Sequence, residues 1–174
     1  MTVTMPETQK SQGYSRLVVL DTATNLAAIP LTAVTAGEIL TCHLYGDFVS
    51  EGGENVGEGP RKMCSRKVPQ EFGNTTDTIT DLQYSHLPQE DDAAPGNEAR
   101  TLMTPGTTKI LLEFQGMDGK GSTFVAGDSY IAHKVKLGRQ RRGRTGDGEF
   151  DQFSITQSVI YADGGEPING VVAA

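Results

Sequence analysis

The sequence has no tryptophan, two cysteines, three histidines and no long apolar run. Because a membrane-spanning helix needs about 20 apolar residues, none is expected. The first residues, MTVTMPETQK, also lack the apolar core of a secretory signal. We therefore expect a cytoplasmic protein in which Cys42 and Cys64 are reduced thiols. With 174 residues, 36% of them hydrophobic, the chain is long enough for one domain with a buried core.

The residues that could bind metal or act as nucleophiles lack the spacings of known catalytic sites. Adjacent Cys42 and His43 would point to opposite faces of a strand. Cys64, His86 and His133 complete no C-x-x-C or H-x-x-x-H motif. No serine lies in a G-x-S-x-G context either. The sequence therefore predicts a protein that is not an enzyme and needs no metal or cofactor.

Charge is distributed unevenly along the chain. There are 22 acidic and 15 basic residues, a net charge of −7, which argues against a surface built to hold nucleic acid. Residues 134–144 nevertheless contain several basic residues and no acidic one, and four of them are Arg139, Arg141, Arg142 and Arg144. Three interpretations stay open here: an exposed loop between strands, a contact with an acidic face of another subunit, and a nucleic-acid contact.

The apolar pattern predicts a mainly β protein, a barrel or sandwich, with one short helix. Extended segments are expected at residues 16–20, 38–45, 77–87, 108–115, 128–137 and 149–161. The helix is expected near residues 97–103, with Asn97 as its N-cap. In the last segment, one face is apolar and the opposite face is polar and uncharged. That polar face consists of Gln152, Ser154, Thr156 and Ser158.

The rest of the single domain, residues 1–174, is expected to be loop and arms. Residues 46–76 are rich in glycine and charge without steady periodicity, which favours a long loop between subunits. Residues 1–15 and 162–174 are interpreted as N-terminal and C-terminal arms. We expect these segments to be poorly ordered in the monomer and to become ordered on assembly.

Four segments together carry a resemblance to a known family. They are residues 29–42 (IPLTAVTAGEILTC), 99–116 (ARTLMTPGTTKILLEFQG), 124–138 (FVAGDSYIAHKVKLG) and 146–161 (GDGEFDQFSITQSVIY). In the order of their turns and strands, they resemble the major tail tube proteins of long, flexible-tailed bacteriophages. The resemblance covers about half of the chain. Residues 46–76 match less well, although the family carries a long loop there, and the basic run RQRRGR departs from the pattern.

The resemblance implies a structural virion protein with a tail-tube-type β-barrel or sandwich. Its copies would form hexameric rings that stack into a hollow tube, through which genomic DNA passes. Further partners would be the tape measure, tail terminator and distal tail proteins, with DNA only as passing cargo and no membrane. Assembly would take place in the host cytoplasm. A net negative wall suits such a conduit, because it does not retain DNA phosphates.

Two sets of surface residues receive expected roles in this interpretation. The four arginines are expected to meet the acidic residues of another copy, namely Glu51, Glu54, Glu58, Glu90, Asp91 and Asp92. The polar face of the last strand is expected to line the lumen. Two other classes stay open: another ring-forming virion component, such as a tail terminator or head-tail connector, and a nucleic-acid-binding β-barrel.

Overall fold

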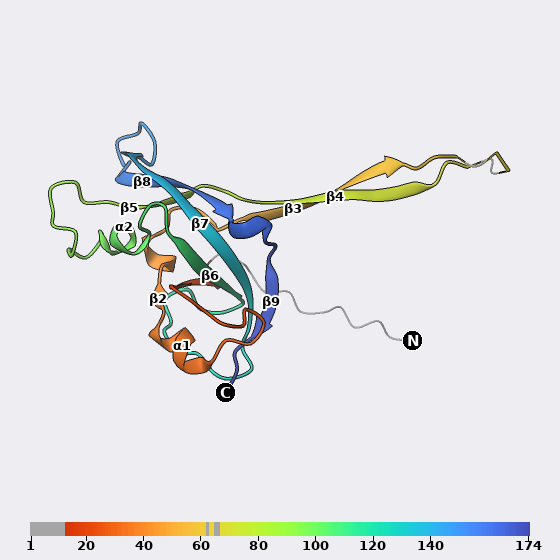
Figure 1. Cartoon of the computed structure of the whole chain (residues 1–174). Coiled ribbons are helices and arrows are strands. Elements are labelled where there is room, and N and C mark those ends of the chain that lie inside the picture. Colours follow the sequence, from red (N-terminus) through yellow and green to blue (C-terminus); the bar gives the residue numbers. More distant parts are fainter. Residues whose placement is uncertain (1–12, 62, 65–66) are drawn as a thin grey trace, which may run out of the picture.

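A computed structural model describes residues 13–61, 63–64 and 67–174. Its centre is a curved antiparallel sheet of seven strands in the order β2-β1-β6-β7-β8-β5, with β9 paired to β7 (Figure 1). These strands are β1 (Ser15–Leu20), β2 (Glu38–Ile39), β5 (Leu82–Ser85), β6 (Thr108–Gln115), β7 (Ser129–Arg144), β8 (Phe153–Tyr161) and β9 (Ile168–Val171). The prediction of a mainly β fold is confirmed. The expected N-terminal arm lies outside the described residues up to residue 12, and Ser15 already belongs to β1.

The sheet buries apolar side chains on both faces. In β1, Leu17 and Val19 enter one hydrophobic core, whereas Val18 and Leu20 enter another on the opposite face. We call the first core A and the second core B. A strand that is buried on both faces has a continuous run of apolar residues in its sequence. The apolar run at residues 17–20 therefore correctly predicted the strand β1.

One short helix contributes to each core. Helix α2 (Glu98–Leu102) contributes Ala99 to core A and matches the predicted helix. Helix α1 (Leu31–Ala36) contributes Val34 to core B. A helix of six residues with one buried side chain has no detectable periodicity, which is why the sequence did not reveal α1.

Residues 38–45 do not form the strand that their alternation predicts. Of residues 38–45, only the two residues of β2 pair with β1. The chain then enters a 3₁₀ turn at Thr41–His43. The hydroxyl of Thr41 accepts a hydrogen bond from the backbone N–H of Leu17, at 2.8 Å. This side chain therefore takes the place of a backbone partner for β1, and pairing with β2 ends there.

Residues 46–76, expected to be a long loop, instead form most of a projecting β-hairpin. Strand β3 (Ser50–Glu58) pairs with β4 (Gln70–Ile79) in a two-stranded sheet separate from the central one. Figure 1 shows this hairpin extending far from the body. We call residues 50–79 the arm. Nearly all its strand residues are exposed, so neither face imposes the alternation that identifies a strand in sequence.

The C-terminal residues 162–174, expected to be an arm, are docked on the sheet. Strand β9 pairs with the first four residues of β7, and Val172 is buried in core B. Gly170 lies so close to the ring of Tyr130 that any larger side chain would overlap it. The glycine-rich composition therefore reflects close packing here rather than a free arm, and that expectation is corrected.

Candidate assembly surfaces

The predicted basic loop is the second half of a long strand. Strand β7 continues without interruption to Arg144 and pairs with β8 as far as Phe153. The turn that joins the two strands lies at residues 145–152. The interpretation of residues 139–144 as a loop is therefore wrong. In residues 141–144 the backbone still pairs with β8, although the side chains are exposed. The apolar pattern of a sequence reflects side-chain burial, so it does not reveal this part of the strand.

A β-bulge in β7 decides which side chains face core A. Between Leu137 and Gln140 the register with β8 shifts by one residue. Regular alternation from the buried Leu137 would turn Arg139 toward the core, whereas the extra residue directs Gln140 inward instead. Gly138 suits this position because a side chain there would overlap the backbone of Ser158.

Two glutamines close the end of core A beside α2. The amide of Gln140 donates hydrogen bonds to the carbonyls of Arg100 and Met103, at 2.9 and 3.0 Å. Gln157 donates to Met103 at 3.0 Å and accepts from the hydroxyl of Tyr84 at 3.0 Å. Burial raises the pKa of Tyr84, so the neutral hydroxyl remains the donor. No sequence pattern points to these roles, since a polar residue in a strand does not reveal the carbonyls to which it donates.

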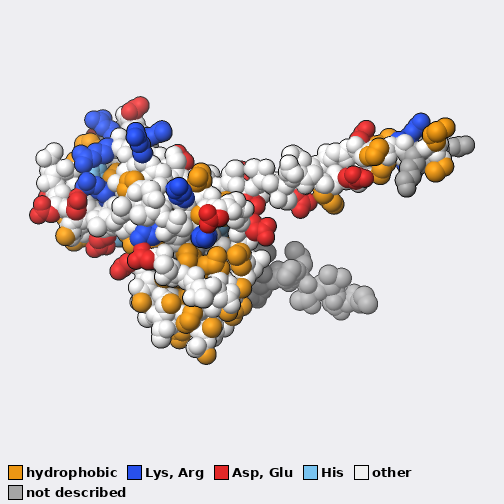
Figure 2. Space-filling model, viewed as in Figure 1, with side chains coloured by type: hydrophobic (Ala, Val, Ile, Leu, Met, Phe, Trp, Pro, Cys, Tyr) orange, Lys and Arg blue, Asp and Glu red, His pale blue; other side chains and the backbone are white. Residues whose placement is uncertain are grey.

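The bulge also divides the arginines between the two sides of the sheet. Arg141 pairs with Thr156 on the polar side, whereas Arg142 and Arg144 continue the side of core A beyond its end. Arg139, Arg141, Arg142 and Arg144 are all exposed, and none forms an ion pair with the residues that the structure describes. These side chains form the basic patch at one end of the molecule (Figure 2).

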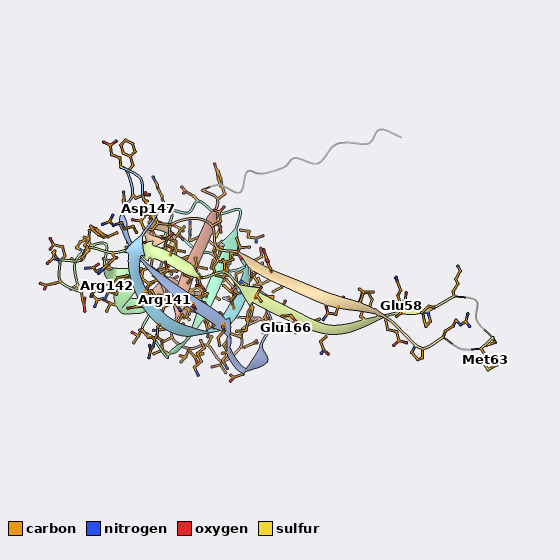
Figure 3. The ribbon with its side chains drawn as sticks, turned by 90° about the horizontal axis from the view of Figure 1, so that it is seen from above. Glu58, Met63, Arg141, Arg142, Asp147 and Glu166 are labelled. Atoms are coloured by element: carbon orange, nitrogen blue, oxygen red, sulfur yellow. The ribbon has the colours of Figure 1, made fainter. Side chains whose placement is uncertain are left out.

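One set of predicted acidic partners lies on the arm. Glu51, Glu54 and Glu58 are exposed along β3. Figure 3 places Glu58 on the projecting arm, with Arg141 and Arg142 at the opposite end of the molecule. The acidic and basic surfaces of one chain are therefore far apart and free to meet those of other copies.

The second set, Glu90, Asp91 and Asp92, lies in the turn before α2. The buried side chain of Asn97 donates to the backbone carbonyls of Glu90 and Asp91, at 3.4 and 3.0 Å. Asn97 is the residue before α2, as predicted, but its side chain makes no capping hydrogen bond. Asp92 pairs with Arg100 within the chain. The turn is thus fixed in shape, and the carboxylates of Glu90 and Asp91 form no ion pair with the described residues.

The four residues predicted to line a lumen are not equally accessible. Ser154 is fully buried and accepts a hydrogen bond from Gln83 at 2.9 Å. A buried serine cannot face a wet channel, so Ser154 is removed from the set. Gln152 lies in the turn before β8, where it accepts from Tyr45 at 2.7 Å. Thr156 and Ser158 remain, half-buried, on the polar side of β8.

The structure places the candidate metal and nucleophile residues apart. Within residues 13–61, 63–64 and 67–174, no cluster of three or more His, Cys, Asp or Glu residues could hold a metal ion. Cys42 and Cys64 are free and exposed. In an open groove of about 510 Å³ beside α2, His43 pairs with Glu98 at 3.1 Å. No helix in the described part of the chain has the length and apolar character needed to cross a membrane.

A buried ionisable cluster lies near the root of the arm. His133 is fully buried, its Nδ1 is 2.9 Å from the hydroxyl of Tyr161, and the ring of Phe48 packs edge-on against it. Its Nε2 lies 3.7 Å from the carboxylate of Glu113, close enough for charge attraction but too far for a hydrogen bond. Burial acts to raise the pKa of Glu113, but the interactions with His133 and Gln115 outweigh it and hold that pKa below its ordinary value.

Acid should therefore destabilise the wild-type protein more than the Glu113→Gln variant. The stability that the Glu113 carboxylate contributes is present above the ordinary carboxyl pKa, about 4.3. It is lost as the pH falls through the lower, folded value. The substitution should lower the free energy of unfolding by roughly 1–2 kcal/mol at pH 7 and by much less at pH 3. Urea unfolding at both values measures this, with the exposed Glu149→Gln as control. An equal loss at both values contradicts the assignment.

The fold and its surfaces define a class of protein. The chain is a β protein whose conspicuous features are a projecting arm with carboxylates exposed along β3 and a cluster of exposed arginines at the opposite end of the molecule, which are features of a structural subunit. The sequence profile described as phage tail tube protein matches residues 2–166, and the chain belongs to this family. It is a structural protein of the phage virion tail that self-assembles into a tube, and it is not an enzyme. The resemblance noted in the sequence is confirmed. A comparison with curated proteins finds no match.

Proposed function

We propose that this tail tube protein assembles, in the host cytoplasm, as hexameric rings that stack into a hollow tube for the passage of genomic DNA. The separation of charge within one chain supports this proposal most directly. Four exposed arginines without ion-pair partners among the described residues lie at one end, and the arm, with Glu51, Glu54 and Glu58 along β3, projects from the other. Surfaces that are complementary but far apart favour head-to-tail contacts, which close into rings or continue into filaments.

The arm supports the same proposal by its structure. Isolated two-stranded sheets are marginally stable, and both outer edges of this one lack strand partners in the described part of the chain. A neighbouring copy that covers the arm would stabilise it. We therefore propose that the arm makes contacts between subunits. The sequence pattern predicts this role for residues 46–76 as a loop, and the structure forms a hairpin there.

The polar side of β8, which is the proposed lumen face, has positive charge close to it. Arg141 pairs with Thr156 on that side, and Arg139 lies in the bulge opposite Ser158. Uncompensated, these arginines would attract DNA phosphates. We propose that Thr156 and Ser158 face the lumen, and that the carboxylates of Glu90 and Asp91 in a neighbouring copy neutralise the two arginines at its rim. The tape measure, tail terminator and distal tail proteins would contact the ends and interior of the tube.

Electron microscopy of the purified protein tests the proposed assembly. Tubes are the expected result. Closed single rings would instead indicate a tail terminator or head-tail connector, and monomers with salt-sensitive DNA binding would indicate a nucleic-acid-binding barrel. Each of those outcomes overturns the proposal.

Replacing Arg139, Arg141, Arg142 and Arg144 by serine should weaken tube formation and make it less dependent on salt. The monomer should keep its thermal stability, because all four side chains are exposed. Each exposed charge pair contributes only about 0–1 kcal/mol, but the contact repeats in every subunit. Light scattering at several salt concentrations measures assembly. A variant that assembles normally but loses affinity for DNA would favour the nucleic-acid interpretation.

A further inference from the structure

The arm carries an exposed apolar pair as well as charge. Val56 and Phe72 are Cα partners across β3 and β4, so their side chains share one face. They are 57% and 77% exposed. Glu54 and Glu58 lie two residues to either side of Val56 on β3. The register irregularity between Glu54 and Val56 places its extra residue on β4, so alternation along β3 keeps these three side chains on one face. This face of the arm thus has an apolar centre flanked by carboxylates.

A complementary arrangement lies at the other end of the molecule. Arg144 and Phe153 are Cα partners, and the guanidinium carbon of Arg144 lies 5.7 Å from the centre of the Phe153 ring. Arg142 lies two residues earlier on the same strand face. Phe153 is 53% exposed. We call these three residues the β7–β8 end. It presents an aromatic centre flanked by guanidinium groups.

We propose that the arm of one copy docks on the β7–β8 end of the next copy. Val56 and Phe72 then pack against Phe153, while the arm carboxylates meet the two guanidinium groups. This inference rests on the proposed tube assembly and names the surfaces that make one of its contacts. Because the two surfaces lie at opposite ends of the molecule (Figure 3), each copy donates an arm and receives one, so the contact propagates.

The apolar centre and the charges have different effects in this contact. Exposed charge pairs alone contribute little, whereas aromatic anchors at the centre of an interface exclude water and contribute most of the affinity. The surrounding charges select the partner and the register. Phe150 is also exposed, but it lies between Glu149 and Asp151, which would repel the carboxylates of the arm. It is therefore a matched control for Phe153.

Charge reversal on each surface tests the docking directly. The arm variant carries Glu54→Lys and Glu58→Lys, and the end variant carries Arg142→Glu and Arg144→Glu. Each variant alone sets like charges against each other, so the protein concentration needed for tube formation should rise roughly tenfold or more. An equal mixture should restore assembly, because the lysine arm fits the glutamate end and the unchanged arm fits the unchanged end. A misfolded variant could not be rescued in this way.

The aromatic variants and the wild type separate the remaining outcomes. Phe153→Ser and Phe72→Ser should each weaken assembly, and Phe150→Ser should not. If the wild type forms tubes but the single-surface variants assemble equally well, or the mixture is not restored, the docking is wrong and tube formation stands. If the wild type forms no higher-order assembly, the proposed function fails and the docking fails with it.

Discussion

Removing residues 51–78 and joining Ser50 to Ile79 through an Asn-Gly turn should give a folded monomer that forms no tubes. Ser50 and Ile79 are Cα partners at the root of the arm, so a two-residue turn can close the ends without moving the body. Among the described residues, the strands β3 and β4 pair only with each other, and Ile79, which is buried in core A, is retained. The body should therefore keep its fold.

Thermal unfolding and electron microscopy of the same preparation measure the two halves of this prediction. The melting temperature should stay within a few degrees of the wild-type value, as expected for the removal of exposed residues. Tube formation should be lost altogether, the largest effect on assembly that we expect from any single change. Deleting only residues 51–59 is a poorer test, because it leaves β4 without its partner strand. Normal tubes from the variant without the arm would show that the arm is dispensable.

The parts of the fold that the sequence predicted are the strands whose side chains are largely buried. Residues 108–115 and 128–137 fall within β6 and β7 almost as expected, because core A and core B impose a pattern on them. In β8, Ile155 and Val159 lie on the face opposite the predicted polar one, and both are buried in core A. In these strands the hydrophobic effect selects apolar side chains on one or both faces, so the sequence records it.

The arm and the basic half of β7 were missed for one shared physical reason. Their strand structure is held by backbone pairing, in β3–β4 and in β7–β8, and not by burial of side chains. Every residue except proline has both a backbone donor and a backbone acceptor, so strand pairing leaves little trace in the choice of residue. The bulge at Gly138 could not be predicted from the sequence either, because it depends on the close approach of the backbone of Ser158. Surfaces reserved for other subunits are thus the hardest to predict from one chain.

Truncating the chain after residue 166 should severely destabilise the body, in contrast to removal of the arm. The truncation removes β9 and the buried Val172. It also removes the Ala173 amide, which donates to Ile29 at 2.8 Å, and the Ala173 carbonyl, which accepts from Leu31 at 2.8 Å. Burial of one valine contributes roughly 1.5–3 kcal/mol and each hydrogen bond roughly 0.5–1.5 kcal/mol. Their joint loss is a large part of the about 5–15 kcal/mol that stabilises a typical domain.

Two neighbouring valines test whether residues 167–174 stabilise the body by packing against it. Val172 is 2% exposed and Val171 is 49% exposed. Val172→Ala should lower the free energy of unfolding by roughly 1–3 kcal/mol, because it leaves a cavity in core B, whereas Val171→Ala should change it little. Urea unfolding of both variants and of the truncated chain measures the difference. If the truncated chain and Val172→Ala both unfold like the wild type, residues 167–174 form a free arm after all, and their packing against Tyr130 does not stabilise the monomer.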